Sequence, residues 1–232
     1  MPSLADMILT PEKRAAEREE RARRFPGSIY QDGADVSPAM YQALVDALAD
    51  GGEEAIQKAL TAHPYLIQYA IKYSGHHGLW AYPKQVIRAT SPNEPGLIPD
   101  FLVVTKNSLG YFWHIVELKK SSVQFANAKG DGLSPQGNLA LSQCYRYQAH
   151  FRDYVDHVRG IMRIADLAQP QDVILLIGDS DLETDAQKQV RAQHQAEGKI
   201  TIATYRRLLG AGLEDLGAFG RLPADALSND GA

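Results

Sequence analysis

Two carboxylates in this 232-residue sequence stand where neighbouring strands would bring them together. The segments Phe101–Thr105 and Tyr111–Leu118 are rich in aromatic and β-branched side chains, and a five-residue loop separates them, so they predict a hairpin. A turn centred midway between them pairs residues whose numbers sum to 217, which sets Asp100 opposite Glu117. Facing residues in an antiparallel pair lie ~4.5–5.5 Å apart. The two carboxylates are therefore predicted to share one divalent cation.

The next residues of the second strand add a lysine to this pair. Lys119 lies two residues beyond Glu117 and so on the same face of the strand. Magnesium takes oxygen ligands and keeps several waters, and it can acidify a water and neutralise charge on a phosphate. Lys119 would hold the attacking water or stabilise the pentavalent phosphate, and the Leu118 carbonyl would be a further metal ligand. The pattern predicts metal-dependent hydrolysis of phosphodiester bonds.

The alternative for the sequence Glu117-Leu118-Lys119 is a solvated strand face that carries alternating charges. Three large apolar side chains share that face, however: Tyr111, Trp113 and Ile115. The face is therefore not simply solvent-exposed, and the register with Asp100 favours the catalytic interpretation.

The elements around this hairpin predict an α/β domain. Helices are expected at residues 10–25, from 37 to 50, from 53, at 138–158, at 184–197 and at 205–209, and further strands at 84–89, 173–177 and 200–204. The polar stretch 121–137 is long for a connection, which is typical of functional loops, and residues 68–78 suit either a loop or a short helix. Hairpin strands pair antiparallel, and strands joined by a helix pair parallel. The expected fold is a mixed sheet flanked by helices.

The N-terminal region predicts an appendage to this domain. Residues 10–25 hold six basic and four acidic side chains with almost no apolar stripe, and Thr10 and Pro11 suit a helix start. A solvated helix or arm is favoured over a phosphate-binding element. The expected division is a charged helix with its linker at residues 1–36, a catalytic domain at 37–221 and a flexible tail at 222–232.

Composition sets broad limits on the function. Hydrophobic residues make up 44% of the chain, yet no apolar run approaches the ~20 residues that span a bilayer. The start of the sequence lacks a signal pattern and Cys144 is the single cysteine, so no internal disulfide can form. A soluble, cytoplasmic protein with no membrane partner is expected. The net charge of −4 leaves a nucleic-acid partner open, because an acidic total can hide a basic groove.

The sequence Pro99-Asp100, followed by Glu117-Leu118-Lys119 on the next strand, resembles the motif of the PD-(D/E)XK nucleases. Gln143 and Tyr147, four residues apart on the following helix, are similar to the Q-x-x-x-Y motif of RecB-like members. Glu53 begins the helix before the sheet, where many members carry an acidic metal-site residue. Residues 53–67 and the ending at 200–209 are similar to the nuclease domain of Shedu anti-phage proteins, so the resemblance covers residues 53–209.

This resemblance implies a restriction-endonuclease-like fold and a DNA nuclease of bacterial anti-phage defence. It implies Mg²⁺, with Mn²⁺ as a substitute, bound by Asp100, Glu117, Leu118 and Glu53. Catalysis is assigned to Asp100, Glu117, Lys119 and Gln143, and substrate contact to Tyr147 and Lys120. A homo-oligomer, either a dimer or a tetramer, and a phage-derived activator are also expected. The chain departs from the pattern at Asp179, where many relatives carry a basic residue.

Two other functions and several other residues remain as alternatives. The chain would otherwise be a catalytically silent protein that binds nucleic-acid ends, or a scaffold that senses a phage component. Gln143 alone suits a polar helix residue, and Tyr147 suits core packing. His76-His77 suits a loop pair, His114 and Cys144 suit the core, and the Gly-Asp-Gly at 130–132 lacks the lysine of a phosphate loop.

Overall fold

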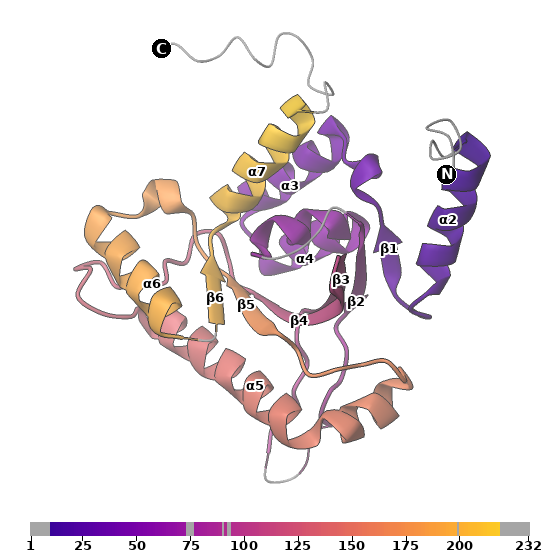
Figure 1. Ribbon diagram of the computed structural model, residues 1–232. Coiled ribbons are helices and arrows are strands. Elements are labelled where there is room, and N and C mark those ends of the chain that lie inside the picture. Colours follow the sequence, from indigo (N-terminus) through magenta and orange to yellow (C-terminus); the bar gives the residue numbers. More distant parts are fainter. Residues whose placement is uncertain (1–9, 73–76, 90, 92–93, 199, 219–232) are drawn as a thin grey trace.

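A single mixed sheet organises the protein. The computed structural model describes residues 10–72, 77–89, 91, 94–198 and 200–218. Across these ranges six strands lie in the order β1-β2-β3-β4-β5-β6, with helices on both faces of the sheet (Figure 1). The first four strands are antiparallel neighbours, and β5 and β6 continue parallel to β4. The predicted mixed sheet flanked by helices is confirmed.

The strands are β1 (Ile29–Gln31), β2 (Leu79–Pro83), β3 (Phe101–Asn107), β4 (Gly110–Leu118), β5 (Asp172–Leu176) and β6 (Ile200–Ala203). The α-helices are α2 (Pro11–Arg23), α3 (Pro38–Asp50), α4 (Glu53–Ala62), α5 (Pro135–Met162), α6 (Asp185–Glu197) and α7 (Tyr205–Ala218). Short 3₁₀ helices cover Gly33–Asp35, Pro64–Ala70 and Ser180–Leu182.

The hairpin β3–β4 has the register that its sequence predicts. The pairs run from Phe101 opposite Val116 to Asn107 opposite Gly110, so partner numbers sum to 217 throughout. The chain then crosses to β5 through α5, and the parallel pairing of β4 with β5 follows. One step beyond the pair Phe101–Val116, this register sets Asp100 against Glu117.

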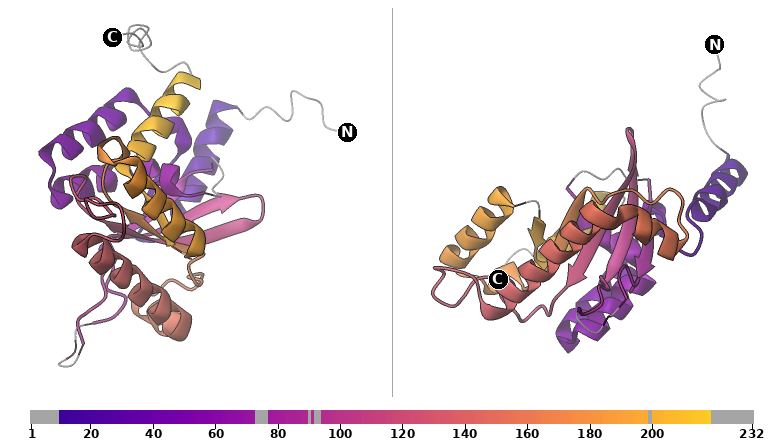
Figure 2. Two further views of the ribbon diagram at one scale, coloured as in Figure 1. Left: turned by 90° about the vertical axis from the view of Figure 1, so that its left-hand side faces the viewer. Right: turned by 90° about the horizontal axis from the view of Figure 1, so that it is seen from below.

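Two hydrophobic layers enclose the sheet, and they decide which face carries the site. Trp113 and Ile115 of β4 and Leu102 of β3 pack with buried residues of α5 on one face. Val103 and Val116 point to the other face, which α3, α4 and α7 cover. Figure 2 shows α5 along one side of the sheet and the other three helices on the opposite side. By strand alternation, Asp100 and Glu117 belong to the α5 face.

The strand expected at residues 84–89 is wrong. The strand that pairs with β3 is β2, which ends at Pro83, and Lys84 follows with a left-handed φ of 50°. Only Arg88 of the expected segment makes a ladder contact, an isolated bridge to Leu97. Residues 84–89 contain the β-branched pair Val86-Ile87 but do not alternate. The true strand, Leu79–Tyr82, is instead buried and apolar throughout.

The linker expected between the charged helix and residue 37 is also wrong. This segment contains β1, which pairs with β2, and the 3₁₀ helix Gly33–Asp35. The charged helix itself is confirmed as α2: Thr10 caps it by accepting from the Lys13 amide, and Pro11 opens it. The indole of Trp80 donates to the Arg21 carbonyl over 2.7 Å, so α2 is attached to the sheet and is not a free arm.

Two helices, α5 and α7, extend further than their sequence patterns suggest. Helix α5 begins at Pro135, where the Ser134 hydroxyl accepts from the Gly137 amide, and α7 continues to Ala218. Among the described residues, no helix combines the length and the apolar character needed to cross a bilayer. The tail expected at 222–232 and His76 lie outside the described residues.

Candidate active site

The two predicted carboxylates meet at the open end of the β3–β4 hairpin. Asp100 directly precedes β3 and is 2% exposed, and Glu117 near the end of β4 is 3% exposed. Two buried carboxylates side by side repel each other and lose hydration, so each needs compensating donors. The structure supplies such donors to every carboxylate oxygen.

Asp100 is held from two directions. The Leu118 amide donates to Oδ2 over 2.6 Å, and the Lys84 ammonium pairs with Oδ1. The main-chain carbonyl of Asp100 accepts from the Lys84 amide over 2.9 Å and from the Gln57 side chain over 3.3 Å. These contacts fix both the backbone and the carboxylate at the entry to β3.

Glu117 is held by the same kinds of donor. Lys119 Nζ lies 2.5 Å from Oε1, and the Tyr147 hydroxyl donates to Oε2 over 2.9 Å. Gln143 Nε2 in turn donates to the Tyr147 hydroxyl over 2.7 Å. The two α5 residues that the sequence singles out thus form one hydrogen-bonded chain with Glu117. Sequence alone had left core packing open for Tyr147, and its ring is indeed buried, but its hydroxyl serves the site.

The electrostatics of Glu117 show that the donors do not fully compensate its charge. Burial, followed by the negative charge of Asp100, raises the pKa of Glu117 to about 7, although Lys119 and Tyr147 oppose the rise. Burial and the nearby Glu117 carboxylate also raise the pKa of Tyr147, so its hydroxyl stays a donor. A further positive charge at this point would therefore be stabilising.

Lys119 is kept as a cation. Burial alone would lower its pKa, but the charge and hydrogen bond of Glu117, with smaller effects from Glu53 and Asp100, raise it. Its backbone is also fixed, because the amide donates to Leu176 over 2.8 Å and the carbonyl accepts from the Tyr205 hydroxyl over 2.6 Å. Lys119 is thus suited to stabilise an anion and unsuited to accept a proton.

The remaining predicted residues lie at the margin of this cluster. Glu53 begins α4, on the opposite face of the sheet, and its charge affects the pKa of Lys119. Lys120 is exposed and is positioned through its carbonyl, which accepts from the Gly178 amide over 3.3 Å. Leu118 contributes its amide to Asp100, and the role of its carbonyl as a metal ligand stays a prediction, as does the metal role of Glu53.

Sequence reasoning missed three residues of the site. Gln57 lies one turn after Glu53 on α4, and this spacing is a signal that both face the same neighbour. Tyr205 carries no such signal, because its contact with Lys119 depends on the parallel pairing of β5 with β6. Lys84 was missed because the sequence-based prediction placed it at the start of a strand over residues 84–89, which the structure does not contain.

The other candidates of the sequence are structural. His114 is buried on the far face of β4, where its ring contacts Thr105 Oγ1 over 3.0 Å and pairs with Asp172. Cys144 is buried, and burial raises the pKa of its thiol, which makes it a poor nucleophile. His77 is exposed. Asp179, where the sequence departs from the pattern that it resembles, pairs with Arg206.

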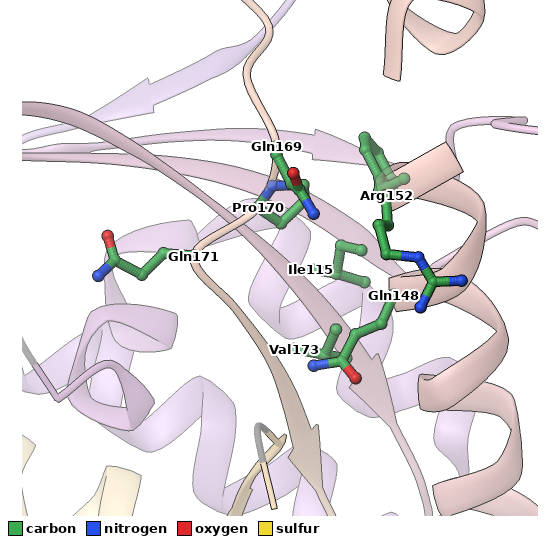
Figure 3. A pocket seen from close by; sticks show the side chains of 8 residues that line it. Ile115, Gln148, Arg152, Gln169, Pro170, Gln171 and Val173 are labelled. Carbon is green, nitrogen blue, oxygen red and sulfur yellow. The ribbon is translucent and has the colours of Figure 1, made fainter. Parts of the chain in front are cut away.

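A pocket of about 210 Å³ lies apart from these groups, between α5 and the segment that leads into β5 (Figure 3). Ile115 and Val173 form its apolar side, and Gln148, Arg152 and Gln169 line its polar side. None of the carboxylates or lysines of the site lines it.

The donor set fits a hard divalent cation. Magnesium binds through one or two carboxylates and keeps several waters, and Asp100 and Glu117 supply two carboxylates whose closeness is unfavourable without added positive charge. In the described ranges, no group of three or more histidine, cysteine, aspartate and glutamate side chains is placed to hold a metal ion. The candidate centre is therefore a two-carboxylate site with ammonium groups on both sides.

No protein-family model matches this sequence, and no curated protein is significantly similar to it. Among solved structures, the chain is similar to the restriction endonuclease FokI, with 12% identity and a TM-score of 0.42 over 95% of this chain and 33% of that one. The structure of FokI bound to DNA gives 13% identity and a TM-score of 0.39 over 97% of this chain. The chain spans about a third of the length of that enzyme.

Proposed function

We propose that this chain is a nuclease of the PD-(D/E)XK class that hydrolyses phosphodiester bonds of DNA. The observation that carries the proposal is the pair of buried, adjacent carboxylates Asp100 and Glu117, each joined to a lysine ammonium. The residues that would hold the cation, Mg²⁺ or Mn²⁺, are Asp100 and Glu117. When bound, the cation would acidify a water and neutralise charge on the phosphate.

The side chains around the carboxylates have separate tasks in this reaction. Lys119 keeps its proton and donates from Nζ to the phosphate oxygen on which negative charge develops. The Tyr147 hydroxyl holds the Glu117 carboxylate in one orientation, and Gln143 orients that hydroxyl. Water forms the new bond to phosphorus and loses a proton to solvent. The bond to the leaving oxygen breaks, and solvent supplies the proton that the leaving oxygen takes.

Substitution of the three central residues tests the proposal. Asp100→Asn, Glu117→Gln and Lys119→Met should each lower the rate of plasmid nicking by on the order of 10³-fold, because each removes a charge that acts on the transition state. Supercoiled plasmid is incubated with Mg²⁺, Mn²⁺ or EDTA, and circular dichroism checks the fold of each variant.

Two exposed residues provide matched controls: Asp153→Asn on α5, outside the site, and Lys188→Met on α6. Both should cut like the wild type. A central variant that cuts at the wild-type rate, or a wild type that cuts equally well in EDTA, would refute the assignment.

The finer points of the proposal come from the resemblance to Shedu nucleases. They are a role in bacterial anti-phage defence, a phage-derived activator, assembly into a dimer or tetramer, and a cytoplasmic location. A silent end-binding protein is disfavoured by the full set of Asp100, Glu117 and Lys119, and the nicking assay separates the two functions.

A further inference from the structure

Lys84 is a second lysine of the site that the PD-(D/E)XK pattern does not assign. It follows the last residue of β2 and turns the chain with a left-handed φ of 50°, a region that L side chains seldom adopt. Its amide donates to the Asp100 carbonyl over 2.9 Å, which brings its side chain alongside the Asp100 carboxylate. An unusual backbone conformation that positions one side chain at a reactive group suggests a functional role for that side chain.

The two carboxylates have parallel surroundings. One oxygen of each accepts from an uncharged donor, the Leu118 amide for Asp100 and the Tyr147 hydroxyl for Glu117. The other oxygen of each pairs with an ammonium group, that of Lys84 for Asp100 and that of Lys119 for Glu117. A cation that binds Asp100 would therefore compete with Lys84 for Oδ1.

The two lysines differ in how easily their ammonium groups can move away from the carboxylates. The Lys119 side chain is 21% exposed and its backbone is fixed on both sides, whereas the Lys84 side chain is 53% exposed. Lysine is a point charge on a flexible four-carbon stem, so it can exchange partners by rotation. When Lys84 leaves Asp100, its ammonium remains at the solvent side of the site, where a phosphate must approach.

We propose that Lys84 holds Asp100 Oδ1 in the free enzyme and transfers its ammonium to a backbone phosphate of the substrate when a divalent cation takes its place. The inference rests on the proposed function. It makes cation binding and nucleic-acid binding support each other, because the phosphate draws Lys84 away from the cation's ligand. Lys84 would thus be a substrate-contacting residue that also sets the cation affinity of the free enzyme.

The test uses cation binding and DNA binding, and needs no cleavage. Isothermal titration of the DNA-free protein with Mn²⁺ should show Lys84→Gln binding roughly 3- to 10-fold more tightly than wild type, because the competitor for Asp100 is gone. With Mn²⁺ present, and in the cleavage-deficient Lys119→Met background so that the DNA stays intact, Lys84→Gln should weaken the binding of a short DNA duplex. The slope of log K against log salt should fall by about 0.9, the value for one phosphate contact. If Lys84 only stabilised the fold, its replacement by glutamine would not strengthen cation binding.

Three variants make each outcome decisive. Lys84→Arg keeps the positive charge, and arginine can donate two hydrogen bonds to a carboxylate. This variant should therefore bind Mn²⁺ more weakly than the wild type and keep the salt slope of DNA binding. Lys188→Gln removes an exposed lysine on α6 and should change neither measurement. Asp100→Asn should abolish Mn²⁺ binding.

Unchanged or weaker Mn²⁺ binding in Lys84→Gln, beside a wild type whose binding depends on Asp100, overturns the role of Lys84 alone. An unchanged salt slope in that variant overturns the transfer to phosphate. A wild type that binds no Mn²⁺ contradicts the proposed function itself.

Discussion

Replacement of Glu117 by glutamine is expected to stabilise the metal-free protein at pH 8 but not at pH 5. Burial and then the charge of Asp100 raise the pKa of Glu117 from 4.5 to about 7. A carboxyl group whose pKa is raised by folding favours the folded state only while it is protonated. Its contribution is fully present below pH 4.5 and is lost as the pH rises through 7. At about 1.4 kcal/mol per pKa unit, ionised Glu117 costs about 3 kcal/mol.

Glutamine removes this cost but also loses a contact. It keeps the shape of glutamate and one acceptor oxygen, so one of the hydrogen bonds from Lys119 and Tyr147 is lost, at about 1 kcal/mol. The net gain is about 2 kcal/mol at pH 8 and close to zero at pH 5. For a chain of this length, 2 kcal/mol corresponds to a rise of roughly 4–8 °C in Tm.

Thermal unfolding in EDTA at the two pH values measures the effect. Glu183→Gln is the matched control, because Glu183 is also buried but is paired with Arg191 through contacts of 2.6–3.0 Å. Breaking that pair should destabilise the protein at both pH values, by about 3 kcal/mol. If Glu117→Gln is less stable than wild type at both pH values, or its gain does not depend on pH, Glu117 is not an uncompensated buried carboxylate.

Three further predictions concern the periphery of the site and the N-terminal helix. Tyr147→Phe removes one donor to Glu117 and should lower kcat roughly tenfold, the value of one hydrogen bond; an unchanged kcat in plasmid nicking would mean that the hydroxyl serves packing only. Glu53→Ala should raise the half-saturating Mg²⁺ concentration in that assay while changing stability by less than about 1 kcal/mol, and an unchanged half-saturation would leave Glu53 a helix-start charge. Deletion of residues 1–23, which keeps β1, should turn the expected oligomer into a monomer in light scattering, and a full-length protein with the mass of one chain would contradict the assembly.

The hairpin and its carboxylates were predictable because their signals are local. Five residues separate two segments that are rich in aromatic and β-branched side chains. The register of β3 with β4 and the facing of Asp100 and Glu117 therefore follow from counting. The contact between Gln143 and Tyr147 follows equally from their spacing on one helix. In both pairs, the distance between the two residues is fixed by the geometry of a single helix or of a hairpin with a short loop.

Lys84 and β1 were not predictable for the opposite reason. The pairing of β2 with β3 joins segments that lie about twenty residues apart, and neither Leu79–Tyr82 nor the three-residue β1 has a periodic pattern. A buried strand without alternation cannot be told from other apolar segments by periodicity. The lysine that reaches Asp100 therefore depends on tertiary pairing, as does the raised pKa of Glu117, which arises from burial.

The type of basic side chain that pairs with each buried carboxylate distinguishes this site from the structural ion pairs of the same protein. Glu183 is buried as deeply as Glu117, but its partner Arg191 binds it with two guanidinium nitrogens, a geometry that is rigid and hard to displace. Asp100 and Glu117 instead have one lysine each, and a lysine makes a single, exchangeable contact. Two adjacent buried carboxylates with exchangeable partners are a poor arrangement for stability, since burial and mutual repulsion raise the pKa of Glu117. The arrangement is well suited, however, to the proposed site, where positive charge from outside must enter and where a phosphate would then meet the displaced Lys84 ammonium group.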